Sequence, residues 1–289
     1  MARAATSGDR LDQWLVVHGR APSRERAQAL IMAGAVTVNG HAADKPGRRV
    51  SPDALVVVHE PACPYASRGG LKLAHALRAF GVDVSGRTAV DLGASTGGFT
   101  DCLLQHGAAR VYAVDVGRGQ LAWRLRTDAR VTLLEGVNAR YLEPARVGGP
   151  CDLVTADLSF VGLRLIWETI RKLLRPRGDV IALVKPQFEA GRGHVGRGGV
   201  VRDPAVHAVV LRDAIDAAHA HGLAAVAATP SPITGPAGNI EYLVHLRAAP
   251  AEPRPVDVGA VVSEAHARFG RANVRGPHPS DGQARQGQG

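Results

Sequence analysis

Short apolar runs alternate with longer amphipathic stretches across residues 67–247 of the chain. The runs are rich in Val, Ala and Leu, and each predicts a buried β-strand. The stretches between most of them carry apolar residues at helical spacing and predict α-helices. This alternation is typical of an α/β fold in which helices cover both faces of a mostly parallel sheet. The predicted strands are residues 88–92, 110–115, 131–135, 152–157, 180–185, 223–229 and 240–247.

Residues 8–60 have the pattern of a smaller α/β module. An apolar stripe near its start predicts a first helix, and a second helix follows between Ser23, which can cap it, and Gly34, which ends it. Residues 35–40 then predict a strand that runs into an Asn-Gly hairpin turn. A further strand, over residues 54–59, completes the module.

Changes in composition mark the boundaries between these regions. Residues 61–66 contain two prolines and are expected to form a linker, so the larger α/β region begins at residue 67 and extends to 247. Residues 248–289 are rich in Pro and Gly and are expected to form a largely disordered tail. Within that tail, residues 256–269 have the pattern of a short helix, whereas residues 276–289 are expected to be disordered throughout.

The overall composition places the chain among folded globular proteins. Hydrophobic residues make up 45% and charged residues 21% of the 289 positions, close to globular averages. The formal net charge of +9 indicates a polyanionic partner, because clustered basic side chains bind phosphates. All but 4 of the 35 Lys and Arg residues are Arg. A remaining Lys is of interest, since a buried Lys can lose its proton near neutral pH whereas Arg cannot.

The cysteines and the absence of long apolar runs indicate where in the cell the protein is expected to be. Cys63, Cys102 and Cys151 are widely spaced and follow no ligand pattern, so they predict neither a disulfide framework nor a metal site. No apolar run reaches the roughly 18 residues that span a bilayer, and the first residues show no signal-peptide pattern. We therefore expect a cytoplasmic protein that does not associate with membranes.

The basic residues of the N-terminal module follow a recognisable arrangement. The chain reads Arg10-Leu11-Asp12, then Ser23-Arg24-Glu25-Arg26-Ala27, then Leu30-Ile31-x-Ala33-Gly34-x-Val36-x-Val38-Asn39-Gly40. This pattern resembles the S4 RNA-binding domain. The resemblance implies that RNA phosphates contact Arg10, Arg24, Arg26 and Lys45, which would position the protein rather than read sequence. The alternative is a solvated helix face with ordinary surface arginines.

A glycine-rich turn follows the first predicted strand of the larger region. Residues 89–101 read AVDLGASTGGFTD, with glycines spaced G-x-x-x-G-G and an acid two positions before the first. This spacing differs from the G-x-G-x-x-G of dinucleotide enzymes and is the pattern of S-adenosylmethionine enzymes. A structural glycine turn is the alternative. Asp115, which ends the next strand, can accept both ribose hydroxyls of an adenosine, and Asn138 is placed to touch the adenine. The expected S-adenosyl-L-methionine-binding residues are Asp91, Gly93, Ala94, Ser95, Thr96, Gly97, Gly98, Asp115 and Asn138.

Four residues that could carry chemistry fall near strand ends or helix starts. Asp157 and Lys185 end two predicted strands, Lys72 lies in the first turns of a predicted helix, and Glu241 begins the last strand. Ligands of open α/β sheets gather at the carboxyl ends of the strands, so Asp157 and Lys185 are expected to face one crevice. This Lys, Asp, Lys, Glu series resembles the FtsJ-type ribose 2′-O-methyltransferases.

Together with the S4-like module, residues 8–247 look like the TlyA family of ribosomal RNA 2′-O-methyltransferases, whose members are also called haemolysins. The resemblance implies a Rossmann-like methyltransferase sheet preceded by a small α/β S4 domain. It also implies methyl transfer to cytidine in 16S and/or 23S rRNA, with ribosomal RNA or ribosomal subunits as partners. The chain departs from the family beyond about residue 250.

The residue types suit this chemistry. A ribose 2′-hydroxyl is a weak acid, so its attack on a sulfonium methyl is helped by a base, which by the resemblance would be Lys185. Burial and the neighbouring Lys72 would favour a neutral amine. Asp157 and Glu241 oppose that effect and are expected to orient the lysines and the hydroxyl. In the alternative, Lys72 with Glu241 and Asp157 with Lys185 form purely structural ion pairs.

The sequence also suggests a role for two aromatic residues and leaves two alternative functions open. Phe160 and Phe188 lie just beyond reacting residues and either stack on a flipped base or pack in the core. A non-catalytic S4-type RNA-binding protein is a second hypothesis, which the presence of all four candidate catalytic residues disfavours. A membrane-active haemolysin is a third, disfavoured by the lack of an apolar or amphipathic membrane segment.

Overall fold

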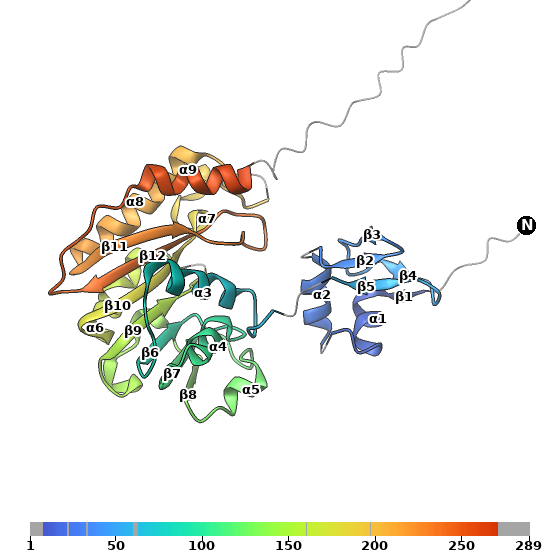
Figure 1. Cartoon of the computed structure of the whole chain (residues 1–289), viewed down its shortest axis with the longest axis horizontal. Coiled ribbons are helices and arrows are strands. Elements are labelled where there is room, and N and C mark those ends of the chain that lie inside the picture. Colours follow the sequence, from blue (N-terminus) through green and yellow to red (C-terminus); the bar gives the residue numbers. More distant parts are fainter. Residues whose placement is uncertain are drawn as a thin grey trace, which may run out of the picture. The chain divides into compact units, whose positions relative to one another are not determined.

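The chain divides into two compact units in a computed structural model, which describes residues 8–21, 23–32, 34–59, 63–159, 161–196 and 198–270 (Figure 1). The smaller unit comprises Met1–Pro64 and the larger unit Tyr65–Gly289. Each unit has hydrophobic cores of its own. The two are therefore described separately.

In the smaller unit, two helices and short strands enclose one apolar core. Leu11 and Leu15 of the first helix and Ile31 of the second are fully buried against Val36. The Asn-Gly turn expected after this strand is present, with left-handed backbone at Asn39, and the strand pairs antiparallel with the residues that follow the turn. The elements are β1 (Asp9–Arg10), α1 (Leu11–Val17), α2 (Arg24–Met32), β2 (Val36–Val38), β3 (His41–Ala42), β4 (Arg49–Val50) and β5 (Val56–Val58).

A seven-stranded sheet forms the centre of the larger unit, in the order β11-β12-β10-β9-β6-β7-β8. The strands β10, β9, β6, β7 and β8 are parallel to one another, whereas β12 runs antiparallel to both β10 and β11. The predicted α/β class with a mostly parallel sheet is confirmed. The strands are β6 (Thr88–Leu92), β7 (Arg110–Asp115), β8 (Val131–Glu135), β9 (Cys151–Ala156), β10 (Leu174–Val184), β11 (Leu223–Pro230) and β12 (Tyr242–Ala248).

Helices cover both faces of this sheet because alternate strand residues are apolar on each side (Figure 1). Ala89 and Leu153 belong to the core under α3 and α4, whereas their neighbours Val90 and Val154 belong to the core under α6, α8 and α9. The helices are α3 (Gly69–Phe80), α4 (Gly98–Gln105), α5 (Trp123–Arg126), α6 (Trp167–Leu173), α7 (Pro186–Glu189), α8 (Pro204–Ala220) and α9 (Val258–Phe269), with short 3₁₀ turns at Ala139–Tyr141, Pro144–Val147, Leu163–Leu165 and Arg192–His194.

Two segments differ from the sequence expectation. Strand β10 begins at Leu174, before the predicted residue 180, and includes an irregular stretch where Arg177 has left-handed backbone. The segment expected to be a largely disordered tail is described as far as residue 270. The short helix expected within it, over residues 256–269, is present as α9, which buries Val258, Val262 and Ala265 in the core shared with α8. Residues 276–289, expected to be disordered, lie outside the described residues.

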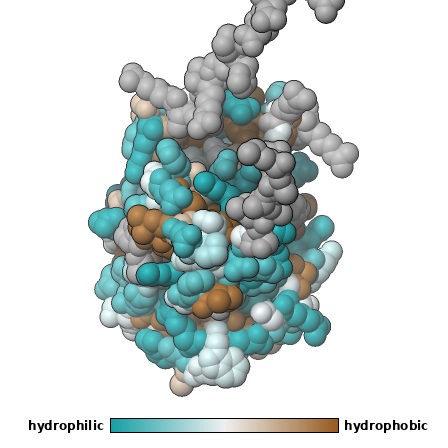
Figure 2. All heavy atoms as spheres, turned by 90° about the vertical axis from the view of Figure 1, so that its right-hand side faces the viewer, coloured by the Kyte–Doolittle hydropathy of each residue, from teal (hydrophilic) through white to brown (hydrophobic). Residues whose placement is uncertain are grey.

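The face seen in Figure 2 is largely hydrophilic, with hydrophobic side chains in separate patches. Large hydrophobic residues that are exposed include Val116, Trp123 and Tyr141 of the larger unit. Among the described helices, none has the length and apolar character needed to cross a membrane.

Candidate functional site

The glycine-rich turn between β6 and α4 brings three segments of the chain into close contact. Gly93 has φ of +85°, and a Cβ there would lie 2.5 Å from the carbonyl oxygen of Asp157. A Cβ on Gly98, the first residue of α4, would lie 2.3 Å from Oγ of Ser67. Both distances are too short for a side chain, so these positions need glycine for packing. The turn is consequently pressed against the end of β9 and the residues that precede α3.

Beside this turn lies a cavity of about 360 Å³, a size suited to a small-molecule ligand. Four of the predicted cofactor-binding residues line it: Gly93, Ser95, Asp115 and Asn138. Apolar side chains, including Val137, Leu158 and Ile166, form other parts of the wall. The combination of an apolar wall and a few polar groups is typical of a site for a nucleoside.

Asp115 is one of two carboxylates that line this cavity. Its two oxygens accept hydrogen bonds from the backbone N–H groups of Ser95 and Gly117, each at 2.7 Å. Because a carboxylate accepts about four hydrogen bonds, Asp115 retains room for the hydroxyl groups of a ligand. Asn138 uses Oδ1 to accept the backbone N–H of Arg140 at 3.0 Å, which orients its amide beside the cavity.

Asp91 does not line the cavity, contrary to the direct cofactor contact expected from the sequence. Its side chain is fully buried and accepts hydrogen bonds from the hydroxyls of Thr100 at 2.7 Å and Thr155 at 2.9 Å. Burial raises the pKa of Asp91 to about 6, partly offset by these hydrogen bonds. Asp91 therefore joins β6 to α4 and β9. The other predicted cofactor-binding residues that do not line the cavity are Ala94, Thr96, Gly97 and Gly98.

The four candidate catalytic residues form two ion pairs. Lys72 Nζ lies 2.5 Å from Glu241 Oε2, and both side chains are buried. Lys185 Nζ lies 2.6 Å from Asp157 Oδ1. Asp157 also lines the cavity, so the second pair stands at its border. These are the pairings expected if the four residues form purely structural ion pairs. The same pairings would also orient the two lysines for catalysis.

Sheet register and a glutamine connect the two ion pairs. Val184 pairs with Tyr242, so Lys185 and Glu241 lie at the same edge of the sheet. Gln187 Nε2 donates to Glu241 Oε1 at 3.2 Å, which links the segment after Lys185 to the Lys72–Glu241 pair. The sequence placed Asp157 and Lys185 at one crevice, and the structure joins them in an ion pair. No role was predicted for Gln187.

Ser159 is a second polar group that sequence reasoning missed. Lys185 Nζ donates to Ser159 Oγ at 3.2 Å, and Ser159 lines the cavity. In the sequence, its position two residues after Asp157 is the feature that could have identified it as a site residue. Phe188 lies with its ring centroid 5.7 Å from Lys185 Nζ, whereas Phe160 lies outside the described residues.

In the smaller unit, the predicted RNA-contacting arginines are organised by Asp12. Arg10 and Arg24 each place Nε 3.0 Å from an oxygen of this buried carboxylate. The hydrogen bond from Arg10 holds the pKa of Asp12 well below its usual range despite burial. Both guanidinium groups remain partly exposed, as is Lys45. The side chain of Arg26 lies outside the described residues.

No group of three or more metal-ligating side chains occurs within the described part of the chain. Cys102 and Cys151 are buried, and burial raises the pKa of both thiols to about 12. Neither cysteine therefore has the thiolate character of a nucleophile.

Comparison with known proteins links both units to described families. Residues 65–248 match the FtsJ-like methyltransferase family, and residues 9–56 match the S4 domain. YqxC of Bacillus subtilis, provisionally named as an rRNA methyltransferase, is 51% identical over 82% of this chain and 85% of its own length. The 16S/23S rRNA (cytidine-2′-O)-methyltransferase TlyA of Mycobacterium tuberculosis is 48% identical over 86% and 91% of the two chains. A solved structure from Streptococcus thermophilus, described as a hemolysin, superposes with a TM-score of 0.75 at 41% identity and covers 93% of this chain and 99% of its own.

Proposed function

Since this chain belongs to the TlyA family of FtsJ-like methyltransferases with an S4 domain, we propose that it methylates the ribose 2′-hydroxyl of cytidine in ribosomal RNA. The observation that carries the proposal is the meeting of the Lys72–Glu241 and Lys185–Asp157 pairs beside the 360 Å³ cavity. Asp157 belongs to both features. A methyl donor in the cavity would therefore adjoin the residues that handle the acceptor hydroxyl.

S-adenosyl-L-methionine is the proposed methyl donor, and it supplies an electrophilic sulfonium methyl group when bound. The residues present fit it. Asp115 offers a carboxylate to ribose hydroxyls, and Asn138 offers an amide to the adenine edge. Val137 and Ile166 provide apolar wall for the purine. Gly93 allows the turn to approach Asp157 closely, because a Cβ there would lie 2.5 Å from the carbonyl oxygen of Asp157.

Lys185, as a neutral amine, is proposed to take the proton from the ribose 2′-hydroxyl. The proton would pass from the ribose oxygen to Nζ as that oxygen bonds to the methyl carbon in place of the donor's sulfur. Asp157 and Ser159 hold this amine in place at 2.6 and 3.2 Å. Lys72 and Glu241 are proposed to orient the acceptor ribose. Positioning is the main contribution of the group, since in-line geometry governs methyl transfer.

The S4 unit is proposed to hold the RNA by its phosphates. Asp12 fixes Arg10 and Arg24 in orientation, and their exposed N–H groups are free to pair with phosphate oxygens. Lys45 would add a point charge. These contacts position the substrate, whereas the larger unit performs the reaction.

Transfer of labelled methyl groups to unmodified ribosomal subunits and free rRNA tests the proposal. Alkaline hydrolysis should leave the label in resistant dinucleotides, because a 2′-O-methyl group blocks cleavage at that position. Lys185→Ala should abolish incorporation while S-adenosylmethionine affinity stays unchanged. Lys172→Ala removes an exposed lysine that pairs with Glu168 and serves as the matched control.

The outcomes separate the possible roles. Label released as mononucleotides would indicate base methylation and contradict the proposal. Loss of cofactor binding in Lys185→Ala would assign Lys185 to the cofactor cavity. Absence of incorporation by wild-type protein that binds the cofactor and RNA would favour a non-catalytic RNA-binding protein.

A further inference from the structure

A second cavity, of about 750 Å³, lies in the larger unit at the edge of the sheet away from the candidate site. Strand register fixes this separation. Tyr242 pairs with Val184 at the site edge, and Arg247, which lines the second cavity, pairs with Asp179. Five residues of extended strand span about 17 Å. The second cavity is therefore distinct from the proposed methyl-transfer site.

The chain after β12 builds this cavity together with an irregularity in β11. The backbone N–H of Ala249 donates to Gly222 at 3.1 Å, and that of Arg254 donates to Ala225 at 2.7 Å. Between these anchors stand Pro250 and Pro253, which have no N–H to donate. The pairing of β11 with β12 shifts register between Ala225 and Ala227. The segment consequently arches away from the sheet and leaves a hollow.

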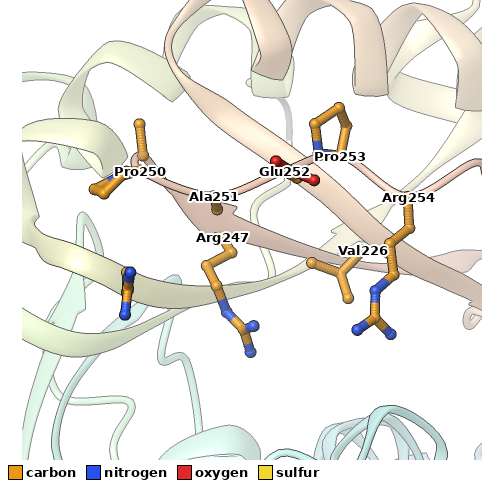
Figure 3. Close-up of a pocket in the computed structure, with 9 residues that line it drawn as sticks. Val226, Arg247, Pro250, Ala251, Glu252, Pro253 and Arg254 are labelled. Atoms are coloured by element: carbon orange, nitrogen blue, oxygen red, sulfur yellow. The ribbon is translucent and has the colours of Figure 1, made fainter.

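Three guanidinium groups line the hollow, together with a single carboxylate. Arg177, Arg247 and Arg254 belong to the lining, and Glu252 is the carboxylate. Figure 3 shows Arg247 and Arg254 extending in the same direction on either side of Val226, whereas Glu252 stays close to the arching segment. Within the described residues, Arg177 and Arg254 take part in no ion pair. Their charge is available to a ligand.

Arg247 is fixed at the base of the hollow. It contacts Asp179 through Nε and Nη2, each at 3.0 Å, and Arg87 contacts the other oxygen of Asp179 at 2.7 Å. Two guanidinium groups thus share one carboxylate, and the surroundings keep an excess of positive charge. Arg247 is 40% exposed in its side chain, so part of its hydrogen-bonding edge faces solvent.

Arg177 has unusual backbone for its residue type. Its φ of +63° lies in the left-handed region, which costs a residue with a Cβ about 1 kcal/mol or more. Strain of this kind persists where the surrounding structure enforces it, and it often accompanies binding sites. Here the turn places an unpaired guanidinium at the rim of the hollow.

We propose that this basic hollow binds phosphate groups of the RNA backbone. Guanidinium groups recognise phosphate through paired N–H donors, and the apolar surfaces of Val226 and the two prolines limit competition from water. This inference rests on the proposed RNA substrate. It adds a second contact with that substrate, on the catalytic unit and about 20 Å along the strand from Glu241.

The test compares Arg177→Ala/Arg254→Ala with the matched double variant Arg78→Ala/Arg146→Ala, which removes two exposed arginines outside the hollow. Affinity for ribosomal RNA is measured between 50 and 200 mM salt. Loss of two duplex phosphate contacts should reduce the salt slope by about 1.8, so the affinity lost over this range shrinks about 12-fold. The KM for RNA should rise with kcat unchanged. The control should keep the wild-type slope, and melting temperatures verify that both variants fold.

An unchanged slope in the hollow variant, or an equal change in the control, would overturn the proposal. A second experiment, with inorganic phosphate, tests whether the hollow binds a small anion and not RNA. If phosphate raises the melting temperature of wild type but not of the hollow variant while RNA affinity is unaffected, the hollow takes a small anion instead. Methyl transfer by the wild-type protein is measured in the same preparation. Its presence establishes the RNA substrate independently, so failure of the hollow and failure of the proposed function remain distinguishable.

Discussion

Replacing Asp91 by Asn should change how the stability of the larger unit depends on pH. The carboxyl of Asp91 is fully buried, and burial raises its pKa from 3.8 to about 6, with a smaller contribution from the charge of Asp157. A group whose pKa is higher in the folded state stabilises the fold while it is protonated. That stabilisation is complete below pH 3.8 and is lost as the pH rises through 6. Asn cannot ionise and lacks this dependence.

The size of the effect follows from the shift. One pKa unit corresponds to about 1.4 kcal/mol, so a shift of about two units gives about 3 kcal/mol in total. About 2.5 kcal/mol of this falls between pH 4 and pH 7. The free energy of unfolding of Asp91→Asn minus that of wild type should therefore increase by about this amount over the interval. Other titrating groups cancel in the difference.

Urea denaturation from pH 4 to pH 7 provides the measurement. A Trp14→Phe background leaves Trp123 and the fully buried Trp167, so fluorescence reports on the larger unit alone. Asp213→Asn, which changes an exposed carboxylate of α8, controls for the loss of one negative charge. A constant difference between Asp91→Asn and wild type across the interval would refute the reasoning. It would show that burial does not control the titration of Asp91.

Three further predictions concern the turn, the S4 unit and the pair of histidines His207 and His266. Gly93→Ala should weaken cofactor binding at least about tenfold, because its Cβ would meet a carbonyl oxygen at 2.5 Å; calorimetric titration with S-adenosylmethionine measures this, and wild-type affinity would contradict it. Asp12→Ala should weaken RNA binding although it removes a negative charge, since the two arginines that it orients lose their anchor; tighter binding in a filter assay would show that charge alone matters. Burial lowers the pKa of His207 and of His266 below 6.5, so the stability that they provide is present above pH 6.5 and declines as the pH falls. The melting temperature of His207→Gln should therefore fall less than that of wild type between pH 7.5 and 5.5. Equal falls in the two proteins would show that this pair does not cause the pH dependence.

Strand positions were predictable where a short run rich in Val, Ala and Leu marks a strand. The expected residues 88–92, 110–115 and 131–135 coincide with β6, β7 and β8. The middle residues of β6 and β7 are buried between the helix layers, whereas β8, at the edge of the sheet, is half-buried throughout. The start of β10 was not predictable in the same way. Its first residues, LRPRG, contain Pro, Gly and two arginines, a composition that marks a turn. Pairing of Leu174 with Cys151 extends the strand there, and sequence pattern alone does not reveal a partner.

The candidate site was predictable to the extent that topology determines it. Asp157 and Lys185 meet because parallel strands deliver their carboxyl ends to one edge. Asp91 shows where this reasoning stops. An acid two residues before a glycine turn can face a ligand or the sheet interior, and one residue of strand register decides between them. Here the side chain turns inward to the hydroxyls of Thr100 and Thr155. Thr155 is 64 residues away in the sequence and gave no local signal.

The region after β12 shows that local pattern can identify an element where average composition predicts disorder. Over residues 248–289 the content of Pro and Gly predicts disorder, but the short helix expected over residues 256–269 is present as α9, which has Val258, Val262 and Ala265 on one buried face. Their spacing of four and three residues is that of an amphipathic helix. Docking of α9 on α8 and β11 obliges the preceding chain to cross the edge of the sheet. The arch over the basic hollow is therefore a consequence of the same packing, and substitutions that loosen α9 should weaken RNA binding together with stability.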